Sequence, residues 1–147
     1  MSYVLSDPVD KQLSPEERAR YARHLILPEM GEEGQMKMKK SSVIVVGAGG
    51  LGSPTLLYLA AAGVGKIGII DDDKVDITNL QRQVIHSTAS VGSLKVESAA
   101  NRIRELNPEI EVVEHNIRLD VNNALDLLSD WDVVIDGTDN FPTRYTI

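Results

Sequence analysis

Residues 43–54, VIVVGAGGLGSP, decide the fold of this chain. The segment begins as a run of β-branched residues, which is typical of a buried strand, and it ends where helical apolar spacing starts. Between them, Gly47, Gly49 and Gly52 match the pattern G-x-G-x-x-G, which lets a backbone turn approach a phosphate closely. The free N–H groups and the positive dipole end of the following helix favour an anion there. The segment therefore predicts a nucleotide-binding strand–turn–helix unit and leaves the identity of the nucleotide open.

The same alternation of strand and helix continues along the chain. Strands are predicted at residues 42–47, 66–71, 109–117 and 131–137, and helices at residues 51–64, 93–107 and 121–129. Strands that alternate with helices indicate a parallel sheet with helices on both faces, so the predicted fold class is α/β and Rossmann-like. Residues 138–147 look like the start of another helix. We therefore expect the fourth strand at an edge of the sheet and a domain that is incomplete at its C-terminal end.

A helical segment is predicted before the first strand. The stretch SPEERARYARHL begins at Ser14 and carries Glu17 three residues later, which forms a capping box, so one helix is expected that ends before Pro28. A second short helix, EEGQMKMKK, is expected directly before the strand. Residues 1–13 lack periodicity and are expected to form a flexible tail. Residues 14–147 are then a single nucleotide-binding domain.

Composition restricts the class of protein and its partners. A chain of 147 residues with 42% hydrophobic and 25% charged residues is typical of one globular domain. Its net charge of −7 argues against wholesale binding of nucleic acid or of an anionic membrane. No apolar run has the length of a signal peptide or a membrane span, so we expect a cytoplasmic protein. The chain has no cysteine, which excludes a disulfide, a thiolate zinc site and a catalytic thiol within it.

A carboxylate follows the second predicted strand. Asp71 lies 24 residues after Gly47, near the spacing at which an acidic residue binds a ribose hydroxyl in such folds. This contact suits the ribose of NAD and the ribose of ATP equally. The neighbouring Asp72 and Asp73 are expected to be solvated loop residues.

Polar residues of long reach come next in the chain. Asn79 and Arg82 follow Asp71 at the carboxyl edge of the sheet, where ligands of open α/β sheets bind. A dehydrogenase has little use for them, whereas a guanidinium pairs with phosphate oxygens in a bidentate manner. Lys95 opens a predicted helix, although a helix dipole favours lysine at the other end, and a bound phosphate is one reason for its position. Taken alone, each residue also fits a solvated surface.

The segment DGTDN after the fourth strand carries two more carboxylates. Either Asp136 or Asp139 is suited to Mg²⁺, which takes one or two carboxylates together with substrate phosphates. A simple turn explains the same residues. His24, His86 and His115 lack the spacing of a metal site, so structural or surface roles are expected for them.

Together these motifs resemble the ubiquitin-activating-enzyme-like adenylyltransferases of the ThiF/MoeB type, which activate small sulfur-carrier proteins such as that of molybdopterin synthase. The resemblance runs from Ser14 to Ile147 and rests on RYARHLILPEMGEEGQ, GAGGLGSP, DDDKVDITNLQRQVIH, VGSLKVESA and DGTDNFPTRY in this order. It implies that ATP and Mg²⁺ bind at the glycine turn. It also implies that the C-terminal glycine carboxylate of a ubiquitin-like carrier attacks the α-phosphate, so that pyrophosphate leaves and an acyl-adenylate remains. Within the family, RHLILPEMG and DNFPTRY look most like members with a rhodanese domain.

The resemblance also implies roles for single residues. Arg82 and Lys95 bind phosphates, and Asp139 holds the metal ion. Arg23 matches the arginine that such proteins lend across a homodimer to the partner's phosphates. The other nucleotide contacts implied by the motifs are Gly47, Gly49, Gly50, Gly52, Asp71, Thr78, Asn79, Leu80, Gln81 and Asn140.

Full-length members of this family have another half, with paired Cys-x-x-Cys zinc motifs and much of the surface that grips the carrier. Zinc is therefore expected only outside this chain, and activity is not expected of this part by itself. Two other functions stay open. One is half of an NAD- or FAD-dependent oxidoreductase, in which Asn79, Arg82 and Lys95 would be idle. The other is a non-catalytic nucleotide-binding subunit.

Overall fold

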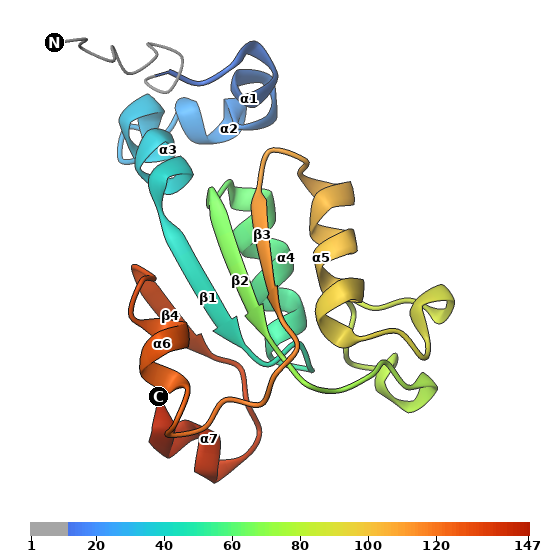
Figure 1. Cartoon of the computed structure of the whole chain (residues 1–147). Helices are drawn as coiled ribbons and strands as arrows, with labels where there is room; N and C mark the ends of the chain where they lie inside the picture. Colours follow the sequence, from blue (N-terminus) through green and yellow to red (C-terminus); the bar gives the residue numbers. More distant parts are fainter. Residues whose placement is uncertain (1–11) are drawn as a thin grey trace, which may run out of the picture.

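The computed structural model describes residues 12–147, which build a parallel four-stranded sheet with helices around it (Figure 1). The strand order is β3-β2-β1-β4, and all three neighbouring pairs run parallel. The strands are β1 (Ser42–Val46), β2 (Lys66–Ile70), β3 (Glu111–His115) and β4 (Val133–Asp136). The predicted α/β class is confirmed, and β4 lies at an edge as expected.

Helices cover both faces of the sheet, as predicted. On one face, α4 (Gly52–Ala62) and α5 (Lys95–Leu106) pack against Val45, Ile67 and Ile69. On the other face, α6 (Ala124–Leu128) packs against the alternate positions Ile44, Val46 and Ile70. Successive side chains of a strand point to opposite faces, and here both faces are buried, so β1 and β2 carry no polar residue after their first positions, Ser42 and Lys66.

Trp131 completes the second face. Its ring lies over Gly68, where an added Cβ would approach the ring to 2.7 Å, and Lys66 Nζ lies 5.1 Å from the ring centroid. A glycine in the middle of β2 therefore makes room for a large aromatic side chain from the segment just before β4. Within the described residues, no helix has the length and apolar character needed to cross a membrane.

The N-terminal segment forms three short helices, α1 (Pro15–Arg20), α2 (Ala22–Leu25) and α3 (Gly31–Lys40). The capping box of Ser14 and Glu17 is confirmed, but the single helix predicted to follow it is wrong, because the helix breaks at Tyr21. Tyr21 has φ −99° and ψ 15°, and its side chain is buried against the end of α4 near Gly63. This tertiary contact overrides the local helical preference.

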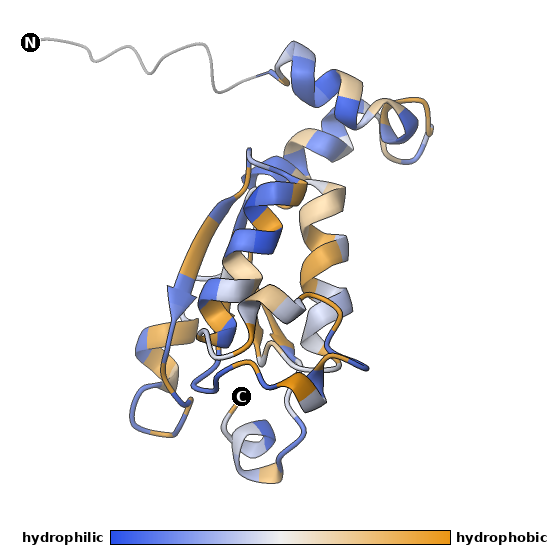
Figure 2. Ribbon diagram, turned by 90° about the vertical axis from the view of Figure 1, so that its right-hand side faces the viewer, coloured by the Kyte–Doolittle hydropathy of each residue, from blue (hydrophilic) through white to orange (hydrophobic). Residues whose placement is uncertain are grey.

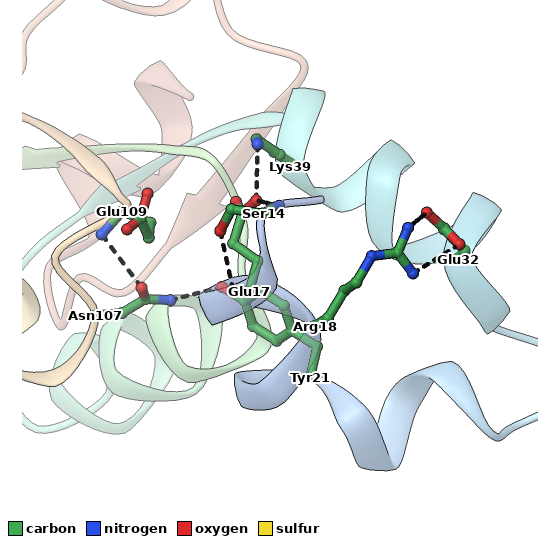
Figure 3. Close-up of polar contacts among 8 residues, drawn as sticks. All are labelled: Ser14, Glu17, Arg18, Tyr21, Glu32, Lys39, Asn107 and Glu109. Carbon is green, nitrogen blue, oxygen red and sulfur yellow. Dashed lines mark hydrogen bonds and ion pairs between the residues drawn. The ribbon is translucent and has the colours of Figure 1, made fainter. Parts of the chain in front are cut away.

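Buried polar contacts fasten these helices to the rest of the fold (Figure 3). Asn107 Nδ2 donates to the Tyr21 hydroxyl at 2.8 Å and to the Ala60 carbonyl at 2.9 Å. Within the N-terminal helices, Lys39 Nζ of α3 pairs with the buried Glu17 of α1 at 2.9 Å. Of the tail predicted at residues 1–13, residues 1–11 lie outside the described part, and Leu13 is buried. In Figure 2 the N-terminal helices are coloured mainly hydrophilic, and hydrophobic colour gathers in the sheet and the helices that pack on it.

The parallel topology gives the sheet two different ends. The carboxyl ends of the strands meet the glycine turn, the long loop with η2 (Ile77–Asn79) and η3 (Thr88–Ser90), and α7 (Phe141–Thr146). The helices α1, α2 and α3 lie at the opposite, amino end (Figure 1). The predicted binding residues after the strands therefore gather at one edge.

Replacing Asn107 by alanine tests the attachment of the N-terminal helices. Asn107→Ala removes the donor to the Tyr21 hydroxyl and to the Ala60 carbonyl. We therefore expect the free energy of unfolding to fall by about 2 kcal/mol. Urea unfolding measures this as a lower midpoint with an unchanged slope. Asn101→Ala, an exposed asparagine on α5, is the matched control and should stay near wild type. Equal midpoints for the two variants would contradict this role of Asn107.

Candidate nucleotide-binding site

The glycine turn after β1 depends on close contact between backbones. Gly47 has φ +98°, in the left-handed region that favours glycine, and its N–H donates to the Ile70 carbonyl at 2.7 Å. A Cβ on Gly52 would lie 1.8 Å from the Gly47 carbonyl oxygen. Only a glycine at position 52 therefore lets α4 begin directly against the turn. Gly52 shapes the turn from inside and does not line the cavity beside it.

A cavity of about 690 Å³ opens over this turn at the carboxyl end of the sheet. It brings together residues from the turn, from the end of β2, from the long loop and from the segment after β4. The predicted site residues in its wall are Gly47, Gly49, Gly50, Asp71, Arg82, Lys95, Asp139 and Asn140. The arrangement combines a glycine turn, two cations and carboxylates, which is suited to a phosphorylated ligand.

Other predicted residues lie outside this wall. Thr78 and Asn79 shape the η2 turn, because Thr78 Oγ1 donates to Asp76 at 2.6 Å and Asn79 Oδ1 accepts the Asp76 N–H at 3.0 Å. Leu80 and Gln81 follow in the same turn. Arg23 lies on α2, at the opposite end of the sheet from the cavity. The described chain thus brings only part of the predicted set to one place.

Asp71 is oriented by backbone donors. Its Oδ2 accepts the N–H of Ala48 at 2.9 Å, and its Oδ1 accepts the N–H of Asp73 at 2.9 Å. The first bond holds the carboxylate against the glycine turn. The carboxylates of Asp71, Asp72 and Asp73 also lie within 4.8 Å of one another.

Lys95 has a protein partner that the sequence did not suggest. Its Nζ lies 3.3 Å from Asp73 Oδ2, and its N–H donates to the Asp73 carbonyl at 3.0 Å. The Lys95 side chain is only 8% exposed, whereas that of Asp73 is 69% exposed. A carboxylate therefore accounts for the lysine at the N-terminus of α5 without any phosphate. Asp73 is solvated, as expected, but it is also an ion-pair partner.

The two carboxylates after β4 differ in their contacts. Asp136 accepts the N–H of Thr138 at 2.9 Å and its hydroxyl at 2.6 Å, and it lies 3.8 Å from Arg144 Nε. Asp139 makes no side-chain hydrogen bond or ion pair within residues 12–147, and it lines the cavity. A carboxylate beside a phosphate-binding turn fits the oxygen donors that Mg²⁺ prefers. Asp136 therefore stabilises the turn after β4. The carboxylate oxygens that fit a metal ion at the cavity are those of Asp139.

His86 joins the glycine turn to α5. Its Nε2 lies 2.9 Å from the Ala48 carbonyl and therefore donates, so its Nδ1, 2.8 Å from Ser98 Oγ, accepts from that hydroxyl. Burial lowers the pKa of His86, and the nearby Lys95 charge lowers it further, against the opposing effects of the Ala48 carbonyl and Asp71. The structural role expected for His86 is therefore to hold the glycine turn against α5.

Sequence reasoning missed several residues of the cavity wall. Ile117, Arg118 and Leu119 follow β3, at the same edge as the other loops, so the rule that ligands bind at strand carboxyl ends could have found them. Gln83 and Thr138 also line the cavity, and both are buried. Whether Gln83 and Thr138 reach the cavity wall depends on tertiary packing, which a local sequence pattern does not show.

The histidine contact predicts a pH dependence of stability. Because the pKa of His86 is lower in the folded chain, the unfolded chain takes up its proton first as the pH falls. The free energy of unfolding should then fall from about pH 6.5 downwards, by up to about 1.4 kcal/mol per pH unit, until the folded pKa is passed. Urea unfolding at about pH 7.5 and about pH 5.5 measures the loss. His86→Gln should reduce it and His115→Gln should not; an equal loss in both variants would contradict the assignment.

Comparison with known proteins agrees with this geometry. The model of the ThiF family matches residues 21–147. A probable adenylyltransferase/sulfurtransferase, MoeZ of Mycobacterium tuberculosis, is 58% identical over 135 residues, covering 92% of this chain and 34% of that protein. The adenylyltransferase and sulfurtransferase MOCS3 of Aedes aegypti is 54% identical over 136 residues, covering 92% of this chain and 31% of its own length. The chain thus spans about one third of the curated relatives it matches.

Solved structures share the fold. The E. coli tRNA N6-threonylcarbamoyladenosine dehydratase TcdA, crystallised in complex with ATP, superposes with a TM-score of 0.85 at 34% identity and covers 91% of this chain and 55% of its own. E. coli MccB with ATP has a TM-score of 0.73 at 31% identity and covers 82% of this chain and 37% of its own. The family match extends over residues 21–147, which is most of the chain, and the MoeZ relative covers 92% of it. This chain belongs to the ThiF family.

Proposed function

We propose that the protein to which this chain belongs uses ATP and Mg²⁺ to adenylate the C-terminal glycine carboxylate of a ubiquitin-like sulfur-carrier protein. The observation that carries the proposal is the position of Arg82 and Lys95 in one cavity with the glycine turn. Relatives named as adenylyltransferases support the reaction type, and the ATP complexes of TcdA and MccB support the nucleotide. An oxidoreductase would have less use than a triphosphate-binding enzyme for two cations beside the glycine turn, where Lys95 would serve only its ion pair with Asp73.

Charge neutralisation is the main demand of this reaction. A carboxylate that attacks a polyphosphate is an anion approaching an anion, and no protein nucleophile is needed. The Arg82 side chain lies beside Gly50, with its Cδ 3.6 Å from the place of a Cβ there, so its guanidinium can serve phosphates on the turn. Lys95 is largely buried, and burial strengthens its attraction to a phosphate. The absence of cysteine is therefore no obstacle to adenylation.

The remaining residues fit supporting roles. Asp71, held against the turn by the Ala48 N–H, suits a ribose hydroxyl. Asp139 would hold Mg²⁺, which supplies positive charge to the phosphates and the leaving pyrophosphate. Asn79 Oδ1 accepts the backbone N–H of Asp76 within the η2 turn. The amide nitrogen of Asn79 is therefore the group left for the proposed nucleotide contact.

Arg23 fits the proposal only through a second copy of the chain. It is exposed on α2, while the cavity lies at the other end of the strands (Figure 1). β1 has five residues and so extends about 16 Å, which separates Arg23 from the cavity of its own chain. We therefore propose a homodimer in which each Arg23 serves the nucleotide of the partner.

Nucleotide preference separates adenylation from the oxidoreductase alternative. In calorimetric titrations of the chain with Mg²⁺ present, we expect ATP to bind with a dissociation constant at least about tenfold below that of NAD. The physical reason is that Arg82 and Lys95 match the extra charge of a triphosphate. Tighter binding of NAD would overturn the proposal.

Removing a cation tests the phosphate assignment. In the protein as its gene encodes it, Lys95→Ala should slow carrier-dependent exchange of pyrophosphate into ATP by roughly 10²–10³-fold, as loss of a preorganised charge contact does elsewhere. A ubiquitin-like sulfur carrier with a C-terminal Gly-Gly is the substrate, and a carrier without its last glycine is the blank. Lys37→Ala, on the exposed surface of α3, is the matched control and should keep full exchange. Unchanged exchange in Lys95→Ala would contradict the role of Lys95.

A further inference from the structure

An arginine outside the cavity wall holds the segment that carries Asp139. Arg144 lies on α7, which follows β4 at the carboxyl end of the sheet (Figure 1), and within residues 12–147 it is not part of the cavity lining. Its Nη2 donates to the Thr138 carbonyl at 2.8 Å, and its Nε lies 3.8 Å from Asp136 Oδ2. One guanidinium thus reaches back across the turn that joins β4 to α7.

These contacts close around the peptide group that precedes Asp139. The Thr138 carbonyl, which accepts from Arg144, belongs to the peptide bond between Thr138 and Asp139. Asp136 holds the same threonine from the other side, because it accepts the Thr138 N–H at 2.9 Å and the Thr138 hydroxyl at 2.6 Å. The residue before Asp139 is therefore fixed at its N–H, at its carbonyl and at its side chain.

The backbone is anchored on both sides of this peptide as well. The Gly137 N–H donates to the Val46 carbonyl at 2.9 Å, at the end of β1 beside the glycine turn. After Asp139, Asn140 Oδ1 accepts the Thr143 N–H at 3.0 Å and caps α7. Asp139 lines the cavity and has no side-chain partner of its own among the described residues. The direction of its carboxylate therefore depends on how its neighbours hold the backbone.

We propose that Arg144 is a positioning residue for the Mg²⁺ ligand Asp139, acting through the Thr138 carbonyl and not by contact with the nucleotide. The inference rests on the proposed function, in which Asp139 holds Mg²⁺. Groups that orient a metal ligand without touching the metal commonly contribute about 10–100-fold to metal affinity. Arginine suits this position, since its planar fork directs one nitrogen to a carbonyl and another to a carboxylate.

Magnesium-dependent binding of ATP measures this role apart from activity. In the protein as its gene encodes it, ATP affinity is measured by calorimetric titration in EDTA and at increasing free Mg²⁺. In Arg144→Ala, the free Mg²⁺ concentration that gives half of the gain in ATP affinity should rise about tenfold or more. ATP affinity in EDTA should stay within about twofold of wild type, because the proposed contact is with the backbone and not with the nucleotide.

Two further variants separate this role from a general effect of losing an arginine. Arg144→Lys keeps a donor for the Thr138 carbonyl but loses the fork, so its half-saturating Mg²⁺ concentration should lie between those of wild type and Arg144→Ala. It also carries the test if Arg144→Ala does not fold. Arg102→Ala on α5 is the matched control, because the side chains of Arg102 and Arg144 are both 45% exposed and each forms an ion pair. Its Mg²⁺ response should equal that of wild type.

A double substitution shows whether Arg144 acts through Asp139. Asp139→Asn removes the charge of the proposed ligand and should abolish most of the Mg²⁺ response by itself. Adding Arg144→Ala to Asp139→Asn should then change the remaining response by less than about twofold, because two residues that act through one ligand are not additive. An additive loss would contradict the positioning role.

The outcomes distinguish the inference from the function on which it rests. A wild-type protein that binds no ATP overturns the proposed function and this inference with it. Wild-type binding of ATP that does not respond to Mg²⁺ overturns the metal assignment of Asp139 and the inference, and it leaves ATP binding in place. A wild-type Mg²⁺ response in Arg144→Ala overturns the inference alone, and so does an equal loss of ATP affinity with and without Mg²⁺.

Discussion

The contact between Gly52 and the Gly47 carbonyl is the constraint on which the rest of the site depends. No side chain fits between them, since a Cβ on Gly52 would lie 1.8 Å from that oxygen. The helix α4 therefore begins against the end of β1, directly after Gly49, Gly50 and Leu51 in the cavity wall. A larger residue would push the helix away and separate the anion-binding helix end from the strands whose loops supply the cations.

Ala48, within this turn, is held from two sides. Its N–H donates to Asp71 at the end of β2, and its carbonyl accepts from His86, which is bonded to Ser98 on α5. The peptide groups of the turn are thus fixed before any ligand arrives. Donors that need no rearrangement bind charge more effectively than mobile ones, so in the proposed function His86 would contribute to phosphate binding by holding the turn.

Local patterns were sufficient for the elements of the fold. The apolar runs of β1 and β2, the glycine turn and the Ser14 cap are each encoded by adjacent residues, and the structure has them where they were predicted. The break at Tyr21, the pairing of Lys95 with Asp73 and the burial of Gln83 depend instead on residues far away in the sequence. The sequence was sufficient to predict Arg82 and Lys95 as site residues. It did not predict that Asp73 forms an ion pair with Lys95.

Lys95 shows how a site can hold a buried cation that the proposed function assigns to a phosphate. Lys95 is charged and buried, and leaving it unpaired would be costly, so Asp73 faces it until a stronger anion competes. A phosphate must therefore compete with a carboxylate at Lys95. In the proposed function, the lysine thus contributes only the difference in free energy between its two anionic partners.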